Sequence, residues 1–389
     1  MSSSPDRPTD QRLASVRERL EYGMDRREVL RTLVGAGYTL GLARWLGVDD
    51  VFDADNGEVP VVTAVVRSDP EDPWSLEPRT RNVPAPWYAR VRKAFELNEM
   101  LARSTITGYL GSAVVPGSYD SGGARITVEV SVDPTELRET LERLADGILI
   151  DIESVNPDDF SEERPVGEPR YVRNPGQPAV PAGVVCESEH SIATLGAPLY
   201  DAESRTRYFS TAQHAFHAAD ETLGSPVSLP FENGERSELG RVAGSYEVAD
   251  VATIEPTGFH QPSSVIAGKS TYEVRGQYTR FGLADLVARS EPLQKVGAMT
   301  GQTSGMIQGI DAVSCLTSRT CRRGQLRWGT ETDMTDGDSG SVSFHRDEQA
   351  DDGSVLIAGF NNARTWWPGQ SYVWGISAYA LTDRHGLHF

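Results

Sequence analysis

The chain has 389 residues, which is long enough for two domains with hydrophobic cores of their own. It contains 37 lysine and arginine residues and 56 aspartate and glutamate residues, so the formal net charge is −19. Nucleic acid and anionic membrane surfaces repel such a chain, and we expect neither as a partner. Acidic residues spread along the whole sequence are typical of proteins from high-salt environments, where ions screen charge repulsion. An ordinary acidic extracellular protein is the alternative.

Residues 1–55 have the features of a leader segment. Arg26 and Arg27 precede an uncharged run over residues 32–43, and Arg44 follows that run. Paired arginines before a modestly apolar segment are typical of a twin-arginine export signal, which predicts an extracellular protein. The run is too short to span a membrane. An amphipathic helix of a cytoplasmic protein is the alternative, because the apolar residues also suit one helical face.

Residues 56–155 are predicted to form a small α+β unit, separate from the rest of the chain. Runs rich in β-branched residues alternate with apolar residues at helical spacing, and Asp133-Pro134 has the composition of a helix start. The other expected elements are a strand, a helix, a strand and a strand, at residues 61–67, 87–104, 124–132 and 147–152. The next segment, residues 156–182, is proline-rich and charged, which predicts an exposed linker that proteases can cut.

Residues 183–389 show the pattern of a β-rich domain. Short apolar runs alternate with turn residues, and few stretches have helical spacing. Strands at this spacing predict an antiparallel barrel or sandwich. The expected strands cover residues 191–200, 207–211, 247–254, 271–278, 305–310, 324–328, 341–344, 355–360 and 371–376.

A turn of small residues around Ser339 is the most informative motif in the chain. A serine hydroxyl becomes a strong nucleophile when an imidazole takes its proton and a buried carboxylate fixes the imidazole tautomer. His214 and Asp250 precede Ser339 in the chain and are the candidates for these two roles. Glycine at position 337 lets the backbone approach a substrate closely, so that the N–H groups of Gly337 and Ser339 can stabilise an oxyanion. We expect Asp338 to be a structural carboxylate within the turn.

Each of these pieces alone has an ordinary explanation. Glycine, aspartate and serine favour turns for local backbone reasons. A single histidine is more often a hydrogen-bonded structural residue, and Asp250 alone can be a solvated acid at a strand edge. The ordered set of histidine, aspartate and serine is what favours catalysis.

The three motifs resemble those of chymotrypsin-like serine proteases. STAQH at His214 is similar to their TAAH, DVATI at Asp250 to their D-[IV]-A-L-[IV] strand, and GDSGS at Ser339 to their GDSGG. Residues 295–305 resemble the VGRTTG hairpin of the bacterial α-lytic protease and streptogrisin branch. The resemblance covers residues 183–389. Two residues depart from it. Ala215 stands where many relatives have a cysteine, and Ser341 replaces the usual second glycine, as in the GNSGS of glutamyl endopeptidases.

The resemblance implies a fold, a reaction and a role for the N-terminal region. The fold would be a double antiparallel β-barrel, closed by a helical turn over residues 378–385. The reaction would be hydrolysis of polypeptides through an acyl-enzyme on Ser339, without a cofactor. The pattern of residues 56–155 resembles the small pro-domains of the α-lytic branch, which implies an intramolecular inhibitor or folding assistant that self-cleavage in the linker releases. A permanent accessory domain is the alternative.

Further residues are candidates for substrate binding and for a disulfide. Asp333 lies six residues before Ser339, where trypsin-like members carry an acid that pairs with arginine or lysine, although it can also be a surface acid. Asn361 and Gly375 belong to runs that we expect to wall the primary pocket. A bridge between Cys315 and Cys321 would close a short hairpin, and two free thiols are the alternative.

The sequence shows no metal-ligand spacing among its cysteines and histidines, and we expect no metal. The three motifs and their resemblance to chymotrypsin-like proteases imply a serine endopeptidase. Two other functions fit the same residues. One is a barrel that binds a peptide or partner while the N-terminal region occludes its triad, and the other is an esterase-like hydrolase, because acyl transfer does not require an amide.

Overall fold

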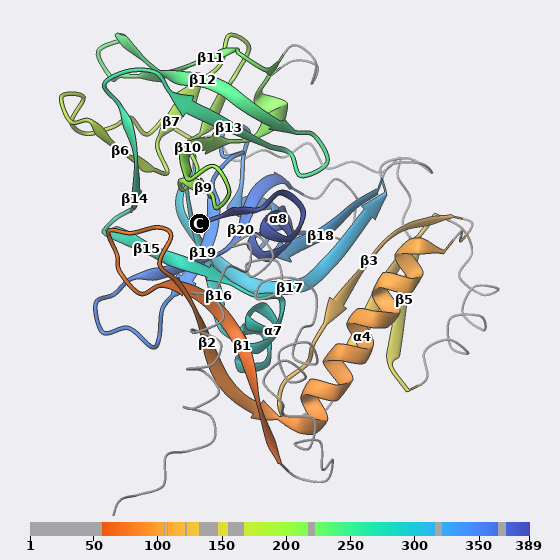
Figure 1. The fold of residues 1–389 in the computed structure, drawn as a ribbon. Helices are drawn as coiled ribbons and strands as arrows, with labels where there is room; N and C mark the ends of the chain where they lie inside the picture. The colour runs from red at the N-terminus through yellow and green to blue at the C-terminus, as the bar shows by residue number, and fades with distance from the viewer. Residues whose placement is uncertain are drawn as a thin grey trace, which may run out of the picture.

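The computed structural model describes residues 57–104, 106, 108–120, 123–131, 147–154, 167–216, 222–315, 321–364 and 371–389. The export-signal pattern, the helix expected from Asp133 and residues 156–166 of the linker lie outside the described residues. None of the described helices is long and apolar enough to cross a membrane. Figure 1 shows two β-units and an N-terminal region of strands beside a long helix.

The first β-unit carries His214 and Asp250. Its strands pair in the order β9-β10-β13-β12-β11-β7-β8, and β22 adds to β9. A hydrogen bond from Gly196 N to Ser210 O joins the end of β8 to β10, so the sheet curls back on itself. The strands are β7 (Val185–Glu187), β8 (Ile192–Thr194), β9 (Leu199–Asp201), β10 (Thr206–Thr211), β11 (Pro226–Pro230), β12 (Arg236–Tyr246), β13 (Val251–Pro256) and β22 (Leu387–His388), with the 3-10 turn η1 (Gln213–Ala215) after β10.

The second β-unit is a closed ring that carries Ser339. Its strands pair in the order β16-β17-β18-β21-β20-β19, and β19 pairs with β16 to close the ring. All of these pairs are antiparallel, so the ring has no free edge of its own. Its strands are β16 (Pro292–Gly297), β17 (Gly301–Cys315), β18 (Cys321–Trp328), β19 (Val342–Arg346), β20 (Val355–Arg364) and β21 (Val373–Ser377).

The remaining elements of the C-terminal part flank the ring. They are β6 (Ala179–Ala182), β14 (Gln261–Ala267), β15 (Thr271–Tyr278), α7 (Arg280–Arg289), the 3-10 turn η2 (Glu331–Asp333) and α8 (Ala378–His385). The two β-units confirm the expected chymotrypsin-like double β-barrel, and α8 lies where the closing helical turn was predicted. The end of the linker is a strand, since β6 pairs with β14 in parallel and buries Val180 and Ala182.

The N-terminal region shares a sheet with the second barrel, which its sequence pattern did not indicate. Strand β1 pairs with β15, and β3 pairs with β17. The expected elements that fall on described residues are present, but strand pairing does not set them apart as a separate unit. The elements are β1 (Glu58–Arg67), β2 (Leu76–Pro84), α4 (Ala85–Arg103), β3 (Tyr109–Val115), β4 (Arg125–Val130) and β5 (Leu149–Ser154). The domain boundaries at residues 55, 155 and 182 stay predictions.

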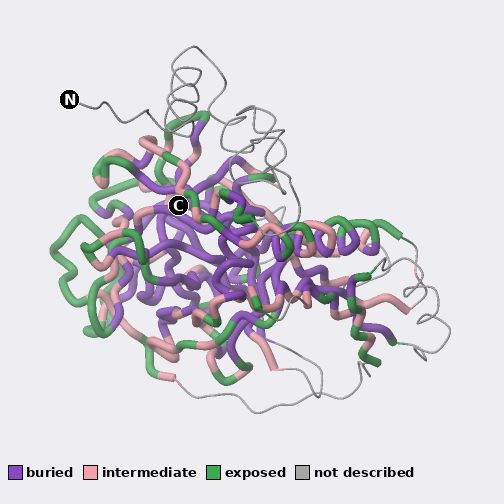
Figure 2. Tube along the Cα trace, turned by 90° about the horizontal axis from the view of Figure 1, so that it is seen from below, coloured by how far each residue is buried: buried purple, intermediate pink, exposed green. Residues whose placement is uncertain are grey.

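Helix α4 packs into the same hydrophobic core as the barrel. Pro84 precedes the helix, and a proline in its first turn costs no hydrogen bond there. The rings of Tyr88 and Phe95 lie 5.0 and 5.5 Å from the ring of Phe281 on α7. Figure 2 shows buried residues running from the centre of the molecule along the inner side of this helix. Removing the N-terminal region would therefore expose apolar surface on the barrel.

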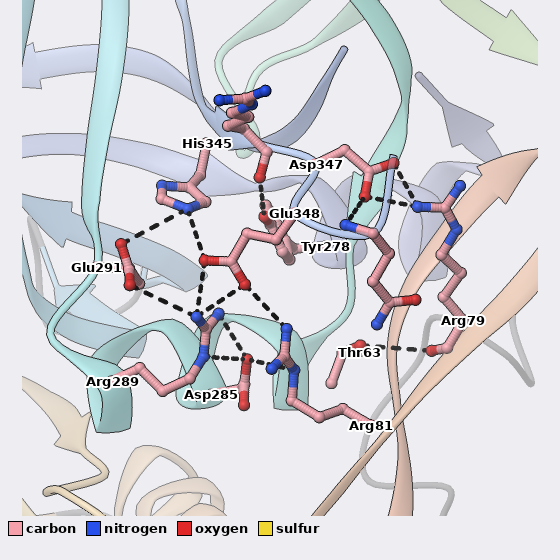
Figure 3. A network of polar contacts seen from close by, with 12 residues as sticks. Thr63, Arg79, Arg81, Tyr278, Asp285, Arg289, Glu291, His345, Asp347 and Glu348 are labelled. Carbon is pink, nitrogen blue, oxygen red and sulfur yellow. Dashed lines mark hydrogen bonds and ion pairs between the residues drawn. The ribbon is translucent and has the colours of Figure 1, made fainter. Parts of the chain in front are cut away.

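A polar cluster also fastens β2 to the barrel (Figure 3). Arg79 binds Asp347, and Arg81 donates to Glu348 at 2.9 Å. Arg289 on α7 binds the same Glu348 at 2.8 Å, so the arginines of two elements share one carboxylate. Ion pairs of this kind add little affinity singly but fix the register of packed elements.

Several elements were not expected from the sequence. Helix α7 is almost wholly buried, so its residues lack the polar face that reveals an amphipathic helix, although Thr279 caps it and Ser290 ends it with a positive φ. Strands β2 and β12 are rich in polar and charged residues, because one face of each is exposed.

The shared sheet and core predict that cutting the linker will not separate the two parts of the chain. A recognition site for a specific protease would be inserted between residues 160 and 161 in a Ser339→Ala background, which removes self-cleavage. After cutting, we expect both fragments to co-elute in size-exclusion chromatography and to separate only in denaturant. Separate elution of two folded fragments in native buffer would contradict the shared core.

Candidate active site

Strand register brings His214 and Asp250 together. In the β10 and β13 pair, Thr211 lies opposite Ala252. Continuing this register places Gln213 opposite Asp250, and Gln213 N donates to Asp250 O at 3.3 Å. The 3-10 turn η1 then presents the His214 ring beside the Asp250 carboxylate. The spacing of the two sequence motifs is thus explained by one antiparallel pair.

The Asp250 carboxylate holds the His214 ring at two points. Oδ1 accepts from His214 N at 2.9 Å, and Oδ2 lies 2.8 Å from Nδ1. Asp250 is buried, and its φ of 56° is in the left-handed region that aspartate tolerates better than most residues. Burial by itself would raise the pKa of this carboxyl, but the hydrogen bonds and charge of His214, with a contribution from Arg322, lower it overall. The carboxylate therefore stays ionised beside the imidazole.

Ser339 lies against the segment that leads to His214. Thr194 N donates to Ser339 O at 2.8 Å, and the next residue, Gly340, has a φ of 96°. A Cβ on Gly340 would overlap the Thr194 carbonyl and lie 3.0 Å from Ala212 N. Only glycine allows the serine loop to approach this closely.

Asn362 on β20 connects the serine to the aspartate. Its Nδ2 donates to Ala249 O at 2.8 Å and to Asp250 O at 3.0 Å, while its backbone carbonyl accepts from Ser339 Oγ at 3.2 Å. The contacts of the described residues include no hydrogen bond between Ser339 and His214. The structure thus brings the imidazole and the carboxylate together. It holds the serine hydroxyl on the backbone carbonyl of Asn362, whose side chain bonds to the backbone at Asp250.

The loop before Ser339 presents two N–H groups without acceptors. Asp338 N, Gly340 N and Ser341 N donate to backbone carbonyls. The N–H groups of Gly337 and Ser339, by contrast, donate to no acceptor within the described residues. Gly337 has a φ of 91°, and a Cβ there would lie 2.7 Å from Met299 Cγ. Two free N–H donors on the serine loop are available to an oxyanion, which needs such donors.

The Asp338 carboxylate fixes the shape of this loop. It is completely buried and accepts from Lys295 Nζ at 3.1 Å, Met299 N at 2.8 Å and Thr300 Oγ1 at 2.5 Å. Thr335 N also donates to it, from within the loop. Lys295 is equally buried, and burial lowers the pKa of its ammonium group against the opposing pull of Asp338. Asp338 therefore has the structural role expected from the sequence.

The three candidate substrate-binding residues occupy different environments. The Asp333 carboxylate accepts from Thr330 N at 2.8 Å and Thr330 Oγ1 at 3.0 Å, which caps η2. Asn361 is fully buried, with its amide bound to Trp328 and Ser341. Gly375 lies opposite Asn361 in the β20 and β21 pair. The structure brings the last two together and engages the side chain of the first in a turn.

Cys315 and Cys321 form a disulfide between the facing ends of β17 and β18. Cys186 is free and buried, and burial raises the pKa of its thiol to about 12.

Glu291, His345 and Glu348 form the one group of three potential metal ligands among the described residues (Figure 3). Arg289 Nη1 lies 2.8 Å from both oxygens of Glu348, so a guanidinium already occupies the place of a cation.

Three residues that shape the site were not identified from the sequence. Asn362 and Lys295 belong to runs that were noted as a pocket wall and a hairpin, without a role for either side chain. Arg322 contacts Asp250 from the other barrel, at 3.4 Å. The only signal for Arg322 in the sequence is its place next to Cys321. Its contact with Asp250 depends on how the two barrels pack, which the sequence does not indicate.

No protein-family model matches the chain, and no curated protein is significantly similar to it. Among solved structures, a glutamic-acid-specific serine protease is similar at 16% identity over 54% of this chain and 99% of its own, with a TM-score of 0.39. Nocardiopsis protease is similar at 16% identity over 54% and 97%, with a TM-score of 0.40. Cellulomonas bogoriensis chymotrypsin is similar at 14% identity over 54% and 98%, with a TM-score of 0.38. At such identities and scores, the chain's own geometry has to support any function.

The buried ion pair predicts that Lys295→Met strongly destabilises the fold. The change leaves the Asp338 charge buried without its cation, which costs about 3–5 kcal/mol of unfolding free energy. Urea unfolding followed by tryptophan fluorescence measures the loss. The double variant Lys295→Met/Asp338→Asn should recover part of it, and Lys269→Met, at an exposed position, should lose little. A Lys295→Met variant as stable as Lys269→Met would show that the pair does not hold the loop.

Proposed function

We propose that the chain is a serine endopeptidase that uses Ser339, His214 and Asp250. The observation that carries the proposal is the His214 ring, fixed through Nδ1 and through its own backbone N–H by one buried carboxylate. In the proposed tautomer, Nδ1 carries the proton and donates a hydrogen bond to Asp250, which leaves Nε2 as the base. The half-exposed ring can meet a substrate, because 48% of its side-chain surface is accessible.

In the proposed reaction, the Ser339 hydroxyl leaves the Asn362 carbonyl by rotation about its Cα–Cβ bond and gives its proton to His214 Nε2. Catalytic hydrogen bonds are often absent before substrate binds. Ser339 Oγ then attacks the scissile carbonyl carbon, and the resulting oxyanion accepts from Gly337 N and Ser339 N. The C–N bond then breaks as His214 passes its proton to the leaving amine. Water next gives a proton to His214 and attacks the acyl carbon, and Ser339 leaves with that proton.

Polypeptides are the proposed substrates. Asn361 and Gly375, which lie opposite each other in the β20 and β21 pair, remain the proposed wall of the primary pocket. We assign no preference for arginine or lysine to Asp333, because the capping of η2 already uses its carboxylate.

The hydrogen bond of Ser339 to the Asn362 carbonyl favours one alternative. A chain that keeps this bond would bind peptides without cleaving them. The experiments below separate the two functions. A protease hydrolyses peptides and loses this activity when Ser339 is changed, whereas a binding barrel shows no hydrolysis with or without Ser339.

Ser339→Ala should abolish hydrolysis of peptide libraries and of casein while leaving the fold intact, because the loop conformation rests on Gly337, Gly340 and Asp338. Ser343→Ala is the matched control, since its hydroxyl is buried and donates to a backbone carbonyl, Gly359 O, as that of Ser339 does. Activity of the unchanged protein towards simple esters but not peptides would indicate an esterase. Activity retained in purified Ser339→Ala would remove Ser339 as the nucleophile.

Asp250→Asn should lower kcat by roughly 10⁴-fold, the effect expected when the imidazole is held in the wrong tautomer. Glu255→Gln on the same strand removes an equal charge at an exposed position and should leave kcat within about two-fold. A drop of only a few-fold in folded Asp250→Asn would mean that another carboxylate orients His214.

A further inference from the structure

Arg322 places a positive charge from the second barrel against the Asp250 carboxylate of the first. It follows Cys321 at the start of β18, next to the disulfide with Cys315. Its Nη1 lies 3.4 Å from Asp250 Oδ2, the oxygen that also faces His214 Nδ1. The side chain is 26% exposed, so the contact is only partly screened by solvent.

Among the described residues, few other charged groups lie against the His214 and Asp250 pair. Within the described residues, β20 contributes the neutral amide of Asn362 and the serine loop contributes the hydroxyl of Ser339. In the part of the chain that the structure describes, the charged groups that act on Asp250 are His214 and Arg322. A guanidinium is protonated at every pH at which a protein is folded. Its charge is therefore a constant part of the pair's surroundings, whereas the charge of the imidazole changes with pH.

A fixed cation beside this pair has two effects on catalysis. It opposes the second positive charge that appears when the imidazole takes up a proton. It also competes for Asp250 Oδ2, which limits how far the carboxylate can favour the imidazolium. The net charge of −19 acts in the opposite direction, because a negative protein attracts protons to its histidines. A local cation offsets that attraction at the one histidine that must stay neutral to act as a base.

We propose that Arg322 is a positioning residue that keeps the His214 and Asp250 pair unprotonated to lower pH. The disulfide fixes the backbone next to Arg322 and so holds the guanidinium at the barrel interface. The inference rests on the proposed protease function for its catalytic meaning. The contact and its effect on protonation can be tested without catalysis.

The direct test follows protonation of the pair by NMR in a Ser339→Ala background. Nitrogen-15 shifts of the His214 ring are recorded against pH, with His214→Gln to assign the signal. In Arg322→Gln, we expect the pair to take up its proton at a pH higher by about 0.5–1 unit, as for a nearby charge in partly exposed surroundings. Arg322→Lys should keep most of the unchanged behaviour. Arg322→Met offers a second neutral variant of similar length in case Arg322→Gln folds poorly.

Arg323→Gln is the matched control. It removes the same charge from the next residue, whose Nη2 donates to Ala102 O instead of Asp250. In the protein that keeps Ser339, kcat/KM falls at acidic pH. The midpoint of this fall should move to higher pH in Arg322→Gln and stay within about 0.2 pH units in Arg323→Gln. A shift no larger in Arg322→Gln than in Arg323→Gln, or a shift downward, would overturn the role of Arg322. An NMR shift without measurable hydrolysis at any pH would support the contact and contradict the protease instead.

Discussion

The buried pair of Asp338 and Lys295 is the constraint on which the candidate site depends. Taking both charges out of water is costly, and it is tolerated only because the carboxylate also receives backbone and hydroxyl donors. Those donors come from the β16 and β17 hairpin and from the serine loop itself. The loop is thereby tied to the barrel with its Gly337 and Ser339 donors free. Without this anchor, a glycine-rich loop would have little reason to keep one conformation.

The site as a whole lies where the two barrels meet. The first barrel supplies the imidazole and carboxylate through one strand pair, and the second supplies the serine loop, Asn362 and Arg322. Each barrel therefore carries an incomplete set of groups. Packing of the barrels brings the groups together, and Asn362 connects them by bonding both to the serine hydroxyl and to the backbone at Asp250.

The sequence was a good guide to local structure and a poor one to long-range contacts. His214, Asp250 and Ser339 could be selected because small residues and apolar runs mark the turns and strands that carry them. The expected helix over residues 87–104 and the strand over residues 61–67 are present as α4 and β1 for the same reason. Neither pattern indicates that β1 pairs with β15, because pairing partners far apart in the chain leave no local periodicity. Arg322 and Lys295 were missed on the same grounds, since an ion pair has no signature in one sequence.

The central claim is that Ser339 is an activated nucleophile. The most direct measurement is labelling of the folded chain with a fluorophosphonate, followed by intact-mass and peptide mass spectrometry. The account predicts one adduct per chain, located on Ser339, with a labelling rate that falls steeply in Asp250→Asn. A folded chain that gains no adduct, or that gains one equally in Ser339→Ala, would contradict it.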